Sequence, residues 1–171
     1  MQDAWAAITG AAVALESEAV RSGMQAFRTR VHGVDAVVCR ARPVGRLTRL
    51  HLFMVVGAFA PGWARTDILD GFMAEAVDAS IRSKGGLVRG AQTGTATIAV
   101  ALTDQVTPDA QGWATKQRRT RYAAIGYPVT VELASGRVTR PDRMLIGAVY
   151  SKALKTFVSE HVTDVLYPAA R

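Results

Sequence analysis

Apolar residues recur at intervals of three and four in several stretches of the chain, which is the spacing of one buried helix face. In the first stretch, Trp5, Ile8, Ala12, Leu15 and Ala19 share that face. These patterns predict helices over residues 4–22, 67–84 and about 144–165. Asp3 and Thr66 are the expected N-caps of the first two, because short oxygen-bearing side chains accept from free helix N–H groups. A shorter helix is expected from Pro108, since proline is tolerated at the first helical position.

Runs of β-branched residues and alternating patterns predict strands between the helices. The segment 47–59 becomes apolar on both faces after residue 53, as in a strand covered on both sides. The segment 95–103 alternates cleanly, with its threonines on one face, and is expected to be half-buried. Pro128 is expected at an edge, a bulge or a strand start. The predicted strands are 34–41, 47–59, 95–103, two pieces of 122–133 broken at 126–128, and 138–140 after a hairpin turn.

This order of elements predicts an α+β fold built on one mostly antiparallel sheet of five to six strands. Two or three helices are expected to pack mainly on one face of that sheet. The chain has no internal repeat or linker, so residues 1–171 are expected to form a single globular domain. A chain of this length buries roughly 68–70% of the surface of its unfolded form, so no disulfide or metal is needed to hold it together.

Cysteine usage and apolar run lengths indicate a cytoplasmic protein. Cys39 is the only cysteine, which excludes an internal disulfide and a thiolate pair for zinc. No apolar run reaches the ~18 residues that span a bilayer. The apolar segment near the start lacks a preceding basic region, so we interpret it as a helix of the fold and expect no signal peptide.

The residue types that carry catalysis or bind metals do not form a recognisable constellation. His32, His51 and His161 are far apart in the sequence, whereas zinc sites need three or four ligands, often at short spacing. The chain has no Gly-x-Ser-x-Gly elbow, and Cys39 is expected to be a small buried residue. We therefore expect no cofactor and no metal. The sequence favours a protein that is not an enzyme, although it leaves the question open.

The segment 84–94 is the most unusual local feature, because it combines four glycines with Lys84 and Arg89. Backbone N–H groups in such a segment can turn towards an anion. However, phosphate loops normally lead from a strand into a helix, and this segment leaves a helix and enters a strand. A helix C-cap with a connecting loop is the favoured interpretation, and an anion site with Arg89 as a clamp is the alternative.

The formal net charge of +7 raises the possibility of a nucleic-acid partner. Arginine outnumbers lysine 17 to 4, which also fits the codon usage of a GC-rich genome. Arginines cluster in the first third and in the last third of the chain, either on one basic face or on separate solvated turns. Trp63, Trp113, Tyr122 and Tyr127 are candidate stacking platforms or core lids. The candidate contact residues for an anion or nucleic acid are Arg42, Arg46, Arg89, Lys116, Arg118, Arg119 and Arg121.

These observations favour a non-catalytic binding or assembly protein, either a homo-oligomer or a subunit of a larger complex, with an unknown ligand. Edge strands that pair across a two-fold axis are the expected route to self-association. The first alternative is a nucleic-acid-binding module that uses arginine-rich turns. The second is an enzyme that acts on an anionic substrate at the segment 84–94. A protein partner or self-association is expected, nucleic acid is the alternative partner, and no membrane association is expected.

Overall fold

The computed structural model describes residues 2–43, 49–84, 93–116, 118–121, 124–142, 144 and 150–168, with only the backbone described at 49, 93 and 118–121. Seven strands in these ranges form one sheet in the order β1-β2-β3-β4-β6-β5, with β7 paired to β6. Their bounds are Gln25–Val31 (β1), Val34–Arg40 (β2), Arg49–Ala58 (β3), Thr93–Thr103 (β4), Arg118–Arg121 (β5), Ala124–Glu132 (β6) and Arg137–Thr139 (β7).

The fold is α+β, but the sheet is mixed rather than mostly antiparallel. β1, β2 and β3 form an antiparallel meander, whereas β3 pairs with β4 and β4 with β6 in parallel. Helix α2 (Thr66–Ser83) lies between β3 and β4 along the chain, and it returns the chain to the edge where β3 began. A helical connection of this kind produces parallel neighbours, which a hairpin cannot do.

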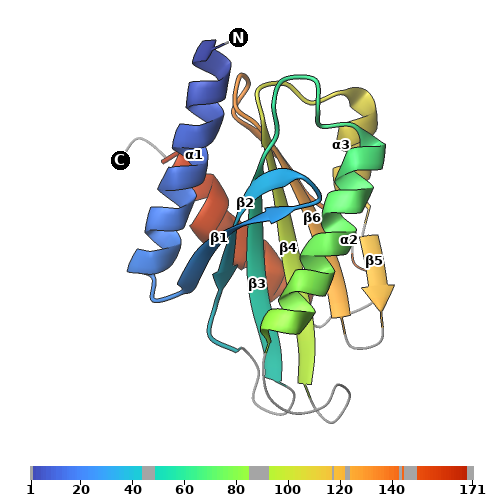
Figure 1. Cartoon of the computed structure of the whole chain (residues 1–171). Coiled ribbons are helices and arrows are strands. Elements are labelled where there is room, and N and C mark those ends of the chain that lie inside the picture. The colour runs from blue at the N-terminus through green and yellow to red at the C-terminus, as the bar shows by residue number, and fades with distance from the viewer. Residues whose placement is uncertain are drawn as a thin grey trace.

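Helices cover both faces of the sheet, which corrects the expectation that they pack mainly on one face (Figure 1). Helix α1 (Gln2–Arg21) and the C-terminal helices lie on one face, and α2 and α3 (Pro108–Ala114) lie on the other. β4 misled the sequence interpretation, because its threonines looked like a solvated face. Thr95, Thr97 and Thr103 are in fact buried, so the strand is covered on both sides.

The sequence patterns missed β1, the strand at one end of the sheet. Its side chains are mostly exposed and include two arginines, so it has neither the alternation nor the apolar run of a buried strand. A two-residue turn joins it to β2, with φ values of 51° at His32 and 75° at Gly33. Two consecutive positive φ values fit the tight hairpin turn whose twist matches that of the flanking strands. The backbone N–H of His32 donates to Glu75 Oε2 at 2.6 Å, which fastens the turn to α2.

The other expected elements agree with the structure apart from their ends, except that the expected break within 122–133 is absent and the short strand β5 was not expected. Thr66 is the first residue of α2 rather than its cap, and β6 runs unbroken through Pro128. Pro128 lies between the stretches of β6 that pair with β5 and with β7, where the lost N–H interrupts neither ladder. The expected last helix consists of α4 (Ser151–Val158), a π-helical turn η2 (Ser159–Thr163) and α5 (Asp164–Leu166), while 145–149 lie outside the described residues.

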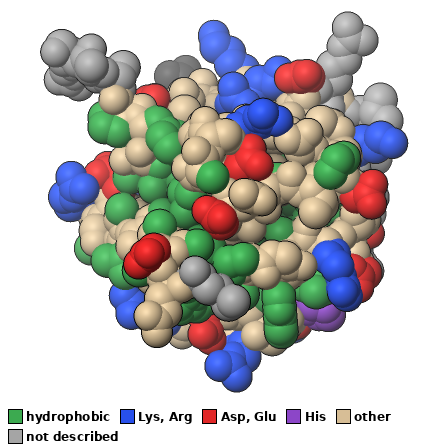
Figure 2. All heavy atoms as spheres, turned by 90° about the horizontal axis from the view of Figure 1, so that it is seen from above, with side chains coloured by type: hydrophobic (Ala, Val, Ile, Leu, Met, Phe, Trp, Pro, Cys, Tyr) green, Lys and Arg blue, Asp and Glu red, His purple; other side chains and the backbone are tan. Residues whose placement is uncertain are grey.

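Among the described residues, no helix has the length and apolar character needed to cross a membrane. Viewed from the end at which α1 begins, hydrophobic side chains crowd one half of the surface with acidic side chains among them, while lysines and arginines lie mostly around the margin (Figure 2).

Candidate ligand-binding groove

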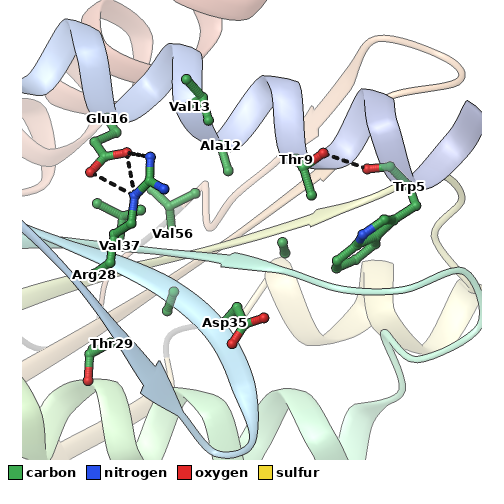
Figure 3. Close-up of a pocket in the computed structure, with 12 residues that line it drawn as sticks. Trp5, Thr9, Ala12, Val13, Glu16, Arg28, Thr29, Asp35, Val37 and Val56 are labelled. Atoms are coloured by element: carbon green, nitrogen blue, oxygen red, sulfur yellow. Dashed lines mark hydrogen bonds and ion pairs between the residues drawn. The ribbon is translucent and has the colours of Figure 1, made fainter.

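A groove of about 330 Å³ opens between α1 and the first three strands of the sheet. Trp5, Thr9 and Val13 project from α1 along one wall (Figure 3). The β1–β2 hairpin forms the opposite wall, and Val56 of β3 lies at the base of the groove. The groove is therefore built by elements that the sequence brings together only through the tertiary fold.

The groove exists because α1 is anchored to the sheet by a narrow set of side chains. Ile8, Leu15 and Ala19 are completely buried against the sheet. Between them and the hairpin, Ala12 and Ala58 line the groove with single methyl groups. Small side chains at these positions leave unfilled space that a leucine or phenylalanine would occupy, and interiors are otherwise close-packed.

A smaller cavity of about 120 Å³ adjoins the groove and shares Trp5, Asp35 and Ala58 with it. Its remaining lining includes Gly33 of the hairpin and Trp63, which follows β3. Together the two adjoining cavities make up a depression that ends beyond the carboxyl end of β3. In sheets with parallel strands and helical crossovers, this edge is where ligands commonly bind.

Three large apolar side chains in this depression are exposed to solvent. Trp5 is 39% exposed, Val13 48% and Trp63 57%. Scattered apolar side chains are normal on a surface, whereas apolar groups that converge on a concavity are typical of interaction sites. Trp5 had been placed on the buried face of its helix, and its exposed indole is the feature that sequence periodicity failed to predict.

The charged groups of the groove are paired within the chain. Arg28 donates from Nε and Nη2 to the carboxylate of Glu16, with a shortest distance of 2.6 Å. The hydrogen bond that Arg28 donates to Glu16 and the negative charge of Glu16 raise the pKa of Arg28 above its ordinary value. On the hairpin, Arg30 contacts Asp35 Oδ1 at 3.2 Å, and about 70% of each of these two side chains is exposed.

All seven sequence-predicted contact residues lie away from this groove or outside the described side chains. Arg42 and Lys116 are exposed, and neither lines the groove. Arg118, Arg119 and Arg121 belong to β5, which lies at the opposite end of the sheet from β1, and their side chains are not among those described. Arg46, Arg89 and the rest of the glycine-bearing segment from 85 to 92 also lie outside the described residues.

The described arginines of the first cluster do not share one basic face. Arg28 and Arg30 contact carboxylates on the α1 side of the sheet. Arg40 instead reaches the end of α2, where it donates to the carbonyl oxygens of Ser83 and Lys84 at 3.3 and 3.0 Å. A cation at this end stabilises the free carbonyls of the helix. These three side chains therefore perform separate structural tasks.

Three of the remaining candidate groups, Cys39, Trp113 and Tyr127, are buried. Cys39 is fully buried as expected, and burial together with the charge of Glu16 raises the pKa of its thiol to about 12. Trp113 and Tyr127 are core residues, and Trp113 donates from Nε1 to Asp70 at 2.9 Å. Within the described part of the chain, no three histidine, cysteine or acidic residues gather as a metal site would require.

Comparison with known protein families, with curated proteins and with solved structures found no match to this chain. The functional assignment therefore depends on the residues of the groove.

Proposed function

We propose that the protein is a non-catalytic binding protein that takes a small apolar or amphipathic molecule into the groove between α1 and the β1–β2 hairpin. The observation that carries this proposal is the pair of adjoining cavities with exposed Trp5, Val13 and Trp63 along them. Its larger part, about 330 Å³, falls within the roughly 300–1,000 Å³ that small-molecule pockets occupy.

The state of the charged groups supports binding rather than catalysis at this site. A carboxyl group that acts as a general acid or base must be able to exchange a proton with the substrate. Glu16 is instead bound by two nitrogen atoms of Arg28, and Asp35 forms an exposed, weaker pair with Arg30. Paired carboxylates of this kind orient a ligand or shape a wall.

A neutral apolar dye tests the proposal. N-phenylnaphthylamine gains fluorescence in apolar sites, and we expect saturable binding to the native protein at micromolar dye. Val13→Asp should abolish the signal, because it places a charge on the groove wall. Val20→Asp is the matched control, since Val20 is also about half exposed on α1 but does not line the groove. Equal signals from both variants, or no saturable signal from the native protein, would reject the groove as the binding site.

Self-association through β1 is a second candidate, supported by the position of this strand at the end of the sheet and by exposed Phe27. Val31 and Val34 flank the two-residue turn and form a hydrogen-bonded pair. In the register with β2, the backbone groups of Arg30, Arg28 and Ala26 therefore point away from β2. Ala26→Pro should then convert a dimer to a monomer without breaking the ladder. A native protein that sediments as a monomer throughout the micromolar range contradicts this candidate.

The nucleic-acid-binding alternative stays a prediction that depends on Arg118, Arg119 and Arg121. Arg28, Arg30 and Arg40 do not add to it, because their side chains are engaged within the chain. Binding should fall steeply with salt and weaken when the three residues are replaced by alanine. The absence of a mobility shift at low salt would rule it out.

A further inference from the structure

The smaller cavity at the end of the groove combines two partly exposed tryptophan side chains with one carboxylate, and buried Phe59 also lines it. Trp5 comes from the first turns of α1, Trp63 from the segment after β3, and Asp35 from β2. Trp5 and Asp35 project from opposite walls, one from the helix and one from the hairpin (Figure 3). With the lining of Ala58 and Ala60, these residues enclose a space of about 120 Å³.

This combination matches the chemistry of an organic cation. The faces of indole rings carry partial negative charge and attract cations, with tryptophan the strongest of the aromatic residues. A carboxylate beside the rings adds a full negative charge. Alkylated ammonium groups benefit most, because they shed water easily and present methyl groups to the rings. An anion would face the same carboxylate at close range, so the small cavity disfavours it.

The larger part of the groove is suited to an apolar chain attached to such a head group. Ala12, Val13, Val37 and Val56 line it with aliphatic side chains, and the shared residues Trp5 and Ala58 connect it to the smaller cavity. The ion pair of Glu16 with Arg28 lies at the far end, on the side away from Trp5 (Figure 3). A ligand with its head at Asp35 would thus lay its chain along the aliphatic walls.

Arg30 competes with a bound cation for the carboxylate of Asp35, so its removal tests the inference. Its guanidinium already contacts Asp35 at 3.2 Å, and both side chains are largely exposed. An exposed pair of this kind contributes little stability, so a bound cation can displace it. Removing the arginine should therefore strengthen cation binding, whereas removing the carboxylate should weaken it.

From these contacts we infer that the ligand is an organic cation with an apolar chain, whose alkylated ammonium head lies between Trp5 and Trp63 beside Asp35. This inference rests on the proposed function and specifies the ligand class of the same groove.

The experiment compares two ligands that differ only in charge. One is a trimethylammonium group on a six-carbon chain with a terminal hydroxyl, and the other is its neutral isostere, in which a quaternary carbon replaces the nitrogen. Isothermal titration at moderate salt measures both. Two indole contacts at partly exposed positions should favour the cation by about tenfold in affinity.

Single substitutions assign that preference to the cavity. Trp63→Leu keeps an apolar wall and should reduce the preference to about threefold or less, with little change for the neutral isostere. Asp35→Asn should weaken binding of the cation alone, and Arg30→Gln should strengthen it. Asp67→Asn is the matched control, because Asp67 is likewise an exposed carboxylate paired with an arginine but lies outside both cavities.

The results separate this inference from the function on which it rests. If the neutral isostere binds as tightly as the cation, the inference is wrong while groove binding stands. An unchanged preference in Trp63→Leu and Asp35→Asn also overturns it, since the cation would then bind elsewhere. If neither ligand binds and the dye does not bind, the proposed function and the inference both fail.

Discussion

Gly57 of β3 lies where the sheet meets α2, and replacing it with alanine tests the packing of that interface. A Cβ atom at this position would lie 2.7 Å from Cζ of Phe72 and 3.0 Å from Cε2 of Phe59. Both rings are buried and pack edge to face with their centroids 5.2 Å apart. Ordinary contacts begin near 3.4 Å, so the Phe72 ring would have to retreat by about 0.7 Å.

The cost of Gly57→Ala follows from that displacement. Overpacking a closed core typically destabilises a protein by about 1–3 kcal/mol. Alanine also reduces the conformational entropy of the unfolded chain, which offsets about 0.4–1 kcal/mol of that loss. We therefore expect a net loss of about 1–2 kcal/mol in the free energy of unfolding. For a chain of this size, that corresponds to a melting temperature lower by about 3–6 °C.

Urea unfolding followed by circular dichroism measures the change, with Gly10→Ala as the control. Gly10 is exposed in α1 and has no atom within 4 Å of an added Cβ, so alanine there should stabilise the helix by about 0.5–1 kcal/mol. Adding Phe72→Leu should recover part of the loss in Gly57→Ala, because the smaller side chain makes room. A Gly57→Ala variant as stable as the native protein would refute the described contact between β3 and α2.

Three further predictions concern single side chains. The raised pKa of Cys39 keeps its thiol protonated, and burial shields the thiol from reagents. Ellman's reagent at pH 8 should therefore label Cys39 only after unfolding. Rapid labelling of the native protein would contradict the burial of Cys39. Arg40→Ala should lower the free energy of unfolding by about 1–2 kcal/mol, because the carbonyl groups at the end of α2 lose their hydrogen-bond donor. Arg42 is exposed, so Arg42→Ala should change the free energy of unfolding by less than about 0.5 kcal/mol in the same urea titration. The hydrogen bond from Ser135 lowers the pKa of Glu132 below its ordinary value of 4.5. The ionised Glu132 therefore contributes stability above pH 4.5, and this contribution is lost as the pH falls through the pKa of the folded protein. Glu132→Gln should flatten the acid limb of a profile of melting temperature against pH, and an unchanged limb would contradict this role of Glu132.

Helix positions were predictable from sequence because one buried stripe is enough to define a helix. The stripe through Ile8 and Leu15 predicted α1, and the pattern after Thr66 predicted α2 to within a residue or two. The direction of strand pairing was not predictable, since it depends on which strands become neighbours after α2 crosses the sheet. β1 escaped detection because an edge strand exposes both faces, and β4 was misjudged because threonine is acceptable in a buried strand.

The groove was harder to predict than the fold, for a physical reason. Its walls come from α1, the β1–β2 hairpin and the segment after β3, so no local pattern marks it. Trp63 was recognisable as a candidate contact because it follows the break at Pro61-Gly62. Trp5 was not, because helical spacing shows which face turns towards the sheet and does not show how far the helix stands from it.

Ligand-induced shifts of the tryptophan indole signals in a ¹H–¹⁵N spectrum test the groove most directly. The sequence has three tryptophans, of which Trp5 and Trp63 line the depression while Trp113 is buried and donates its indole N–H to Asp70. On titration with the six-carbon trimethylammonium ligand, the indole signals of Trp5 and Trp63 should move together and saturate, and that of Trp113 should stay in place. Shifts confined to other parts of the chain, or three unmoved signals at saturating ligand, would contradict the account.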